Sequence, residues 1–455
     1  MSPLATATLG SHMNPWGRPT RRRLLLEALA AGGFLAGACS APATGGPSQP
    51  AAAGALAPGT RLSFASWGGP DVQDISKRFA QTFMEQHPGV SVEFISTASQ
   101  NHNEKITAAS AAGTPIDVFY LQPSDTPSFV ERGLVRSLDD LVKRDRYDTS
   151  DFFEKCLGQY LWKGKLYALP RGFGNQDVYY NVSMLEAAGV AKPPYDWNAK
   201  TWTTDDFLDA AKRLVRLSSG DVAVWGWNQG QGLRQWAPWV WIFGGDILNK
   251  DGTQCILDQP PAVDGLQFVQ DLIYKHRVMP APDQKVNTQN AFGSSQLGMA
   301  LGIPADLTSY RKLQGISWDV APMPRKATRL TSGGGVAWHL AAATASLAGA
   351  WELLKLVAST EFQTSECQAA ATAPPRKSVL RSPCFVDRSQ PPKGIDVFLQ
   401  APDFVHPDPQ AVAWPDIEVE INKGLASLWD GSKTARQVAQ EIVPQANRLL
   451  ATGSR

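Results

Sequence analysis

From residue 61 onward, the hydrophobic positions alternate between the spacing of a strand and the spacing of a helix. Apolar residues occupy every second position in RLSFASW and in VSVEFIS, which predicts two strands. Between these runs, apolar residues recur at helical spacing, at Val72, Ile75, Phe79 and Phe83. A short, mostly apolar run follows in IDVFYLQ, which is typical of a parallel strand buried on both faces. The first part of the chain is therefore predicted to be α/β.

Helical patterns dominate after Trp202. A helix start is visible in TWTTDDFLDAAKRLVRL, where Thr203 precedes Asp206 by three residues and can form a capping arrangement with it. One-sided apolar stripes predict two more helices, in LAGAWELLKLVAST and LWDGSKTARQVAQEIVPQANRLL. Shorter strand-like runs occur in LGMALGI, WDVAPMP and GGGVAWHLA. We expect these runs to return the chain to its first sheet.

Composition and charge narrow the class of protein. The chain has 455 residues, of which 43% are hydrophobic and 19% charged, so it is long enough for two core-forming domains. Its formal net charge is +1, with no long run of like charge beyond Arg21–Arg23, which argues against a nucleic-acid partner. The tryptophan-rich run QGLRQWAPWVWIFGGD is interrupted by Arg234, Pro238 and a glycine pair. It is therefore not a membrane span of ~20 apolar residues.

The N-terminal region has the pattern of an export signal. Paired arginines precede an apolar run, small residues and Cys39 in TRRRLLLEALAAGGFLAGACS. The pattern over residues 13–38 resembles a twin-arginine signal that ends in a lipobox, so we expect cleavage before Cys39 and lipid on its thiol. GSHM ahead of it resembles a cloning remnant or a mis-set start. Residues 39–59 are rich in Pro, Gly and Ala and predict a flexible tether to the outer face of the cytoplasmic membrane.

The remaining cysteines and the polar motifs do not match known catalytic or metal-binding patterns. Cys156, Cys255, Cys367 and Cys384 lack the spacing of metal ligands, and whether Cys367 and Cys384 are bridged stays open. The templates GxSxG, HExxH and the P-loop are absent. We therefore expect neither an enzyme nor a bound metal or cofactor.

Eight motifs in order carry a family resemblance: WGGPDVQDISKRFAQTFMEQHPGVSVEF, AGTPIDVFYLQPSD, ERGLVRSLDDL, GKLYALPRGFGNQDVYYN, TWTTDDFLDAAKRL, FGGDILNKDG, WDVAPMPRK and AWELLKLVASTEFQ. Together they resemble the family 1 extracellular solute-binding proteins of ABC importers, from residue 61 to the C-terminus. The resemblance implies an α/β, two-lobed, type II periplasmic-binding-protein-like fold. It also implies a small-molecule solute, best sought among sugars, and ABC permease subunits as partners of a monomer.

The resemblance also suggests how the chain divides. We predict one lobe from residues 60–170 plus 300–340 and the other from 171–299 plus 341–455. Glycines at the crossings are expected to act as hinges, because small residues often absorb the dihedral change of lobe closure. These are Gly172, Gly174, Gly302 and Gly333.

A sugar site needs aromatic rings that stack on the C–H face of a pyranose and planar polar groups that bond its hydroxyls. Trp67 and Asp125 follow predicted strands, where ligands of open α/β sheets bind. Arg171 lies at the first crossing and Arg376 in TAPPRKS. After LGMALGI, where related sugar-binding proteins often carry an aromatic residue, this chain has Pro304, Ala305 and Asp306. Asp306 could meet a hydroxyl or an ammonium group instead.

The tryptophan-rich run divides between two roles if it is helical. A rotation of 100° per residue puts Trp236, Trp239 and Phe243 on one face and Trp241 on the other. The family resemblance implies that this segment enters the cleft at its start and runs back into the second lobe. We therefore assign Arg234 and Trp236 to the ligand side, leave Trp239 open, and expect Trp241 and Phe243 in the core.

Three functional alternatives stay open. The solute could be a polyamine, an amino-acid derivative or a glycerophosphoryl compound. The chain could be an exported carbohydrate-active enzyme on the same scaffold, or a sensor that reports bound solute to a membrane kinase.

Overall fold

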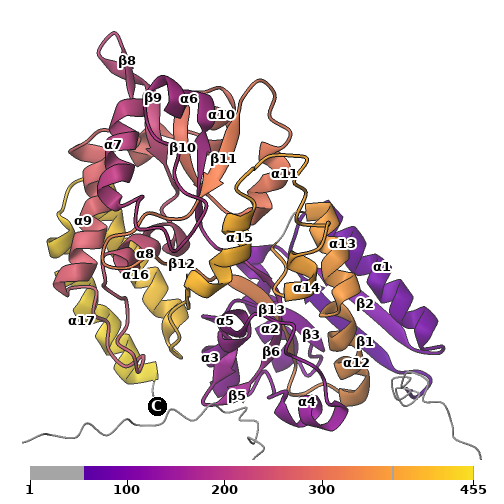
Figure 1. The fold of residues 1–455 in the computed structure, drawn as a ribbon. Helices are drawn as coiled ribbons and strands as arrows, with labels where there is room; N and C mark the ends of the chain where they lie inside the picture. Colours follow the sequence, from indigo (N-terminus) through magenta and orange to yellow (C-terminus); the bar gives the residue numbers. More distant parts are fainter. Residues whose placement is uncertain (1–55, 371–372, 454–455) are drawn as a thin grey trace, which may run out of the picture. The chain divides into compact units, whose positions relative to one another are not determined.

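Two five-stranded sheets organise the part of the chain that the computed structural model describes, residues 56–370 and 373–453 (Figure 1). The predicted signal, Cys39 and the tether up to residue 55 lie outside these residues. Within them, no helix is both long and apolar enough to cross a membrane.

The first sheet has the strand order β2-β1-β3-β13-β6. Its strands are β1 (Arg61–Ser66), β2 (Ser91–Ser96), β3 (Val118–Leu121), β6 (Ala168–Phe173) and β13 (Gly335–Leu340). β1 is parallel to β2 and β3, whereas β13 is antiparallel to β3 and to β6. Helix α1 (Pro70–Gln86) connects β1 to β2, so the predicted strand, helix and strand are confirmed.

Both faces of this sheet are buried, as the apolar run of β3 predicts. Val118 and Tyr120 face a core that includes residues of α1, α12 (Leu347–Val357) and α13 (Thr360–Ala370). Phe119 and Leu121 face a smaller core with residues of α2 (His102–Ala111) and α3 (Thr126–Glu131). Because successive strand side chains point to opposite faces, one short run supplies both cores.

The second sheet has the order β11-β7-β10-β9-β8. Its strands are β7 (Asp177–Asn181), β8 (Arg216–Ser218), β9 (Asp221–Asn228), β10 (Leu297–Gly302) and β11 (Trp318–Ala321). β7 is antiparallel to β10 and β11, β10 is parallel to β9, and β8 is antiparallel to β9. The pairing therefore makes this a mixed sheet.

One large core surrounds the second sheet. Six helices that contribute to it are α6 (Val182–Ala187), α7 (Thr204–Leu214), α8 (Leu233–Ile242), α9 (Pro260–Tyr274), α16 (Trp414–Trp429) and α17 (Ala435–Gly453), and shorter helices add further residues. The predicted cap of α7 is confirmed, because Thr203 N donates to Asp206 Oδ2 at 2.8 Å and Asp206 N donates to Thr203 Oγ1 at 3.2 Å.

Shorter elements connect these layers. The helices are α4 (Asp139–Asp145), α5 (Glu154–Gly158), α10 (Thr288–Gly293), α11 (Leu307–Tyr310), α14 (Lys377–Leu380) and α15 (Asp396–Gln400). The 3₁₀ turns are Ser99–Asn101, Pro282–Gln284, Pro304–Asp306 and Ala401–Phe404. The strand pairs are β4 (Leu161–Trp162) with β5 (Lys165–Leu166), and β12 (Thr331–Ser332) with β14 (Val405–His406).

Strand pairing corrects the predicted lobe boundaries. β10 and β11 lie in the second sheet, although residues 300–340 were assigned to the first lobe. α12 and α13 pack on the first sheet, although residues from 341 onward were assigned to the second lobe. The apolar stripe of α12 was correctly predicted, but a stripe does not specify which sheet it covers. β6 and β7, on either side of the predicted first crossing, belong to different sheets.

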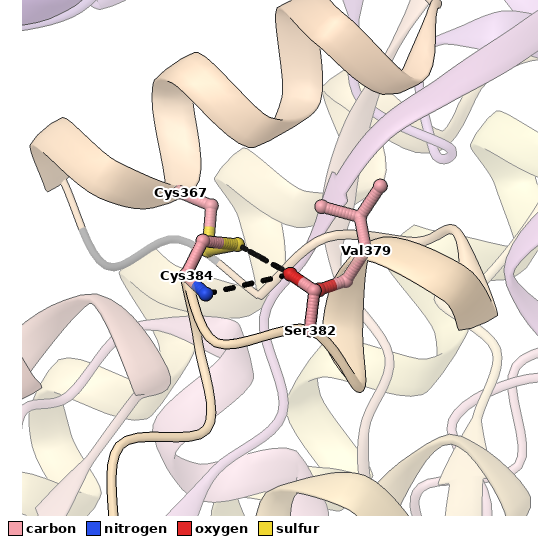
Figure 2. The surroundings of a disulfide bond; sticks show 4 residues. All are labelled: Cys367, Val379, Ser382 and Cys384. Atoms are coloured by element: carbon pink, nitrogen blue, oxygen red, sulfur yellow. Dashed lines mark hydrogen bonds between the residues drawn. A yellow bond between two sulfur atoms is a disulfide. The ribbon is translucent and has the colours of Figure 1, made fainter.

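A disulfide joins Cys367 on α13 to Cys384, which follows α14 (Figure 2). The two Cα atoms are 5.8 Å apart, and the Ser382 hydroxyl lies beside Cys384. The pairing that the sequence left open is therefore present. Cys156 and Cys255 are free and buried, and burial raises the pKa of the Cys156 thiol to about 12 and that of Cys255 to about 11.

Candidate functional site

A hollow of about 220 Å³ lies where segments of the two sheets meet. The first sheet and the loops that follow its strands contribute Trp67, Gln122 and Arg171, and α8 contributes Arg234. The complete lining is Trp67, Gln122, Arg171, Gly172, Phe173, Gly174, Arg234, Ile303, Pro304, Ala305, Gly334, Gly335, Val336 and Ala373. Hollows of about 400 Å³ occur elsewhere, but this one contains three predicted ligand residues.

Trp67 follows β1 and is held in place by edge contacts. Its ring centroid lies 4.7 Å from that of His102 and 5.2 Å from that of Tyr120, both in T-shaped geometry. His102 is itself fixed, because its Nε2 bonds Tyr120 O at 2.8 Å and its Nδ1 bonds Thr97 Oγ1 at 2.7 Å. Burial lowers the pKa of His102 to about 4, so this support is neutral at physiological pH. Trp67 therefore presents a preorganised aromatic surface to the hollow.

Arg171 is the last charged residue of β6 and pairs with Glu366 of α13. Arg171 Nε donates to Glu366 Oε1 at 2.8 Å, Nη2 donates to the same oxygen, and the guanidinium lies 4.6 Å from the Tyr120 ring centroid. Burial opposes the charge of Arg171, but the Glu366 carboxylate outweighs this effect and raises the pKa of Arg171. The arginine is thus rigid and charged at the wall of the hollow.

Arg234 connects segments that belong to the two sheets. Its Nη2 donates to Gln122 Oε1, after β3, and to Asp408 Oδ2, each at 2.9 Å. Burial opposes its charge, but Asp408 outweighs burial and raises the pKa of Arg234. Its guanidinium lies against Gly334, where an added Cβ would be 1.8 Å from Arg234 Nε. Only glycine therefore leaves room for this arginine.

Close packing surrounds two of the predicted hinge glycines, Gly302 and Gly333. A Cβ on Gly333 would lie 1.9 Å from Val405 Cγ1, and a Cβ on Gly302 would lie 2.6 Å from the Tyr179 ring. Gly174 N donates to Gly334 O, and Gly172 borders the hollow beside it. None of the four predicted hinge glycines has a left-handed backbone. A hinge role for them stays a prediction.

Two predicted ligand residues lie away from the hollow. Trp236 lies on α8, and its ring is fully buried in the core around the second sheet. Arg376 is buried in the first lobe, where its guanidinium lies 4.1 Å from the Phe152 ring centroid and Nη2 donates to Tyr147 Oη at 2.7 Å. The structure places both outside the hollow: Trp236 packs the core, and Arg376 fixes the segment before α14.

Asp125 and Asp306 are near the hollow but do not line it. Asp306 Oδ2 accepts from Ile303 N at 2.8 Å and so closes the turn after β10. Asp125 precedes α3, and its pKa is raised by burial. Burial also raises the pKa of Asp306. A ligand role for these two residues stays a prediction.

Three residues of the site were missed by the sequence analysis. Gln122 lies in the same strand-end motif as Asp125, YLQPSD, so the signal that selected Asp125 could also have selected it. Glu366 and Asp408 lie 195 and 174 residues from the arginines that they bind. No local pattern links residues so far apart, and only the fold brings them together.

Comparisons with known proteins agree with this architecture. Residues 78–390 match the family model described as bacterial extracellular solute-binding protein. A Brucella abortus (strain 2308) protein that carries only the general name of a binding protein is 23% identical over 408 residues, covering 86% of this chain and 92% of that one. The sn-glycerol-3-phosphate-binding periplasmic protein of Escherichia coli K12 is 22% identical over 401 residues, covering 82% of this chain and 88% of that one.

Solved structures share the fold as well. The Listeria monocytogenes ABC substrate-binding protein in complex with cycloalternan superposes with a TM-score of 0.75 at 19% identity. The match covers 86% of this chain and 99% of the Listeria chain. At this identity, the likeness concerns the two-lobed fold.

Proposed function

We propose, from the premise that this chain belongs to the family of bacterial extracellular solute-binding proteins, that it captures a neutral sugar in the hollow and delivers it to an ABC importer permease. The observation that carries this proposal is the placement of an aromatic ring beside planar polar groups. Trp67, Gln122, Arg171 and Arg234 all border one hollow. Binding proceeds without turnover of the solute.

The chemistry of these groups suits a pyranose. One ring face of a sugar presents C–H groups that pack on an aromatic surface, while the hydroxyls at its edge need donors and acceptors. The preorganised Trp67 ring supplies the surface. The guanidiniums and the Gln122 amide supply polar groups whose positions are already fixed by hydrogen bonds. The cycloalternan complex of the Listeria protein supports this assignment.

A second candidate is a glycerophosphoryl compound. Its support is the similarity to the Escherichia coli protein named for sn-glycerol 3-phosphate. The two candidates differ in charge, so the arginines of the hollow should distinguish them.

A ligand screen tests the proposed function. Maltose, maltotetraose and cycloalternan are compared with sn-glycerol 3-phosphate, spermidine and amino acids by thermal shift, and hits are measured by calorimetry. We expect at least one saccharide to raise the melting temperature. If only a charged compound does so, the sugar assignment is wrong.

Trp67→Ala is expected to weaken binding of that saccharide about tenfold, or ~1.4 kcal/mol, because the stacking surface is removed. Trp162→Ala is the matched control, since Trp162 is a partly exposed tryptophan of β4 that does not border the hollow. Equal losses in both variants would contradict the role of Trp67.

We also propose that residues 13–38 direct export and that Cys39 carries the lipid anchor. The export of this family supports the first step, and the lipobox-like sequence supports the second. Cys39→Ser is expected to move the protein from the membrane fraction to the soluble fraction and to abolish labelling with radioactive palmitate. Cys156→Ser is the control, because Cys156 is buried in the folded chain. Unchanged labelling of Cys39→Ser would exclude the anchor.

A further inference from the structure

Both arginines that border the hollow are neutralised by buried carboxylates. Glu366 is 2% exposed and the Asp408 side chain 1%, and each accepts from its arginine. A guanidinium stays protonated in proteins, and burying it requires a compensating negative charge. Each pair therefore brings no net charge to the hollow.

Neither carboxylate has another partner that would divert its charge. Glu366 Oε2 and Asp408 Oδ1 are buried without a hydrogen-bond partner within the described residues. Within the described residues, the side-chain hydrogen bonds of each carboxylate therefore go to its arginine alone.

Further carboxyls lie close to Arg234. Asp125 and Glu418 both interact electrostatically with Arg234 and with Asp408. Burial raises the pKa of each, and any ionised fraction adds negative charge around this one arginine. The side of the hollow near Arg234 consequently has no surplus of positive charge.

The absence of surplus charge has different consequences for two kinds of solute. A phosphate needs guanidinium or ammonium charge that is not already compensated, because its desolvation is costly. A neutral hydroxyl needs only an N–H donor or an oxygen acceptor. Arg171 Nη1 takes no part in the bonds to Glu366, so a neutral pair still has a donor to offer.

We infer that Glu366 and Asp408 are specificity-determining residues, which make the hollow reject phosphate-bearing solutes and accept neutral polyols. This inference rests on the proposed function for the location of the site. It predicts a different class of solute from the one for which the similar Escherichia coli protein is named.

The test compares sn-glycerol 3-phosphate with glycerol and with the best saccharide of the screen, by calorimetry at low ionic strength. The wild-type protein is expected to bind sn-glycerol 3-phosphate no better than glycerol. Glu366→Gln removes a negative charge beside Arg171 with little change in shape. It is expected to raise the affinity for sn-glycerol 3-phosphate at least tenfold and to leave the affinity for glycerol unchanged.

Two further variants control for folding and for location. Asp408→Asn should have the same effect through Arg234 if Glu366→Gln does not fold. Asp151→Asn is the matched control, because Asp151 pairs with the buried Arg376 outside the hollow. It should gain no affinity for sn-glycerol 3-phosphate.

The possible outcomes distinguish the inference about charge compensation from the proposed sugar function. Tight binding of sn-glycerol 3-phosphate by the wild type overturns the inference without any variant, and so does a gain in Asp151→Asn equal to that in Glu366→Gln. If no saccharide binds, the proposed sugar function fails. A gain of phosphate binding in Glu366→Gln would still establish charge compensation at the hollow.

Discussion

Replacing Trp236 with alanine is expected to lower the free energy of unfolding by about 3–5 kcal/mol. The ring is fully buried on α8 within the core around the second sheet. Alanine removes its apolar contacts and leaves a cavity that a close-packed core fills only in part. Urea denaturation of the wild type and the variant measures the difference.

The matched variant is Trp236→Phe. The Trp236 indole Nε1 is buried without a hydrogen-bond partner in the described structure, so phenylalanine removes a costly polar group along with some volume. Its loss of stability is therefore expected to be much smaller than that of Trp236→Ala. A Trp236→Ala protein that unfolds like the wild type but binds solute weakly would restore Trp236 to the ligand site.

Asp177→Asn is expected to stabilise the protein at pH 8 and to reduce the dependence of its stability on pH. Asp177 begins β7 and is fully buried, and burial alone raises its pKa well above the usual range. Asn175 Nδ2 donates to Asp177 Oδ2, while Oδ1 of each residue has no partner in the described structure. A protonated Asp177 can donate to the side-chain oxygen of Asn175. An asparagine in place of Asp177 is neutral at every pH.

The sign follows from proton binding. Between the unfolded pKa of about 4 and the raised folded pKa, the folded protein binds the proton more tightly than the unfolded chain. This contribution to stability is complete below the unfolded pKa and is lost as pH rises through the folded pKa, by about 1.4 kcal/mol per pH unit. Other groups near this face of β7 are Tyr179, Asp306, Tyr310 and Arg311.

Urea denaturation at pH 5, 6.5 and 8 tests this expectation. The advantage of Asp177→Asn over the wild type should grow with pH. Asp221→Asn is the control, since Asp221 is exposed on β9 in the same sheet, and it should keep the wild-type profile. Parallel profiles for wild type and Asp177→Asn would show that Asp177 does not control the pH dependence.

Local patterns predicted the elements of the fold but not their assignment to lobes. The alternation in RLSFAS, the stripe of α1 and the cap at Thr203 each act within a few residues, and all three are confirmed. β10 is buried along its whole length, so its sequence fits either sheet equally well. Its place beside β7 depends on contacts between distant segments.

The candidate site shows the same division. Helical spacing predicts that Trp236 and Trp241 lie on different faces, yet the structure buries both tryptophans and leaves only Arg234 of this helix at the hollow. A tryptophan-rich helix that other helices surround has no fully solvent-facing side. The periodicity of its sequence does not reveal that it is surrounded. The carboxylates that neutralise the arginines come from α13 and from the segment before α16, and neither position has a local signal.

The position of β6 at the edge of the first sheet, beside β13, affects how the chain folds during synthesis. The ribosome makes β6 before every strand of the second sheet. Among the strands that the structure describes, β6 pairs in the first sheet with β13 alone, and β13 is made after all the strands of the second sheet. Until β13 emerges, β6 and the edge of β3 that later pairs with β13 have unpaired backbone groups, which can recruit other chains. A nascent chain stalled before residue 335 should therefore aggregate readily and depend on chaperones, whereas one that includes β13 can close its first sheet.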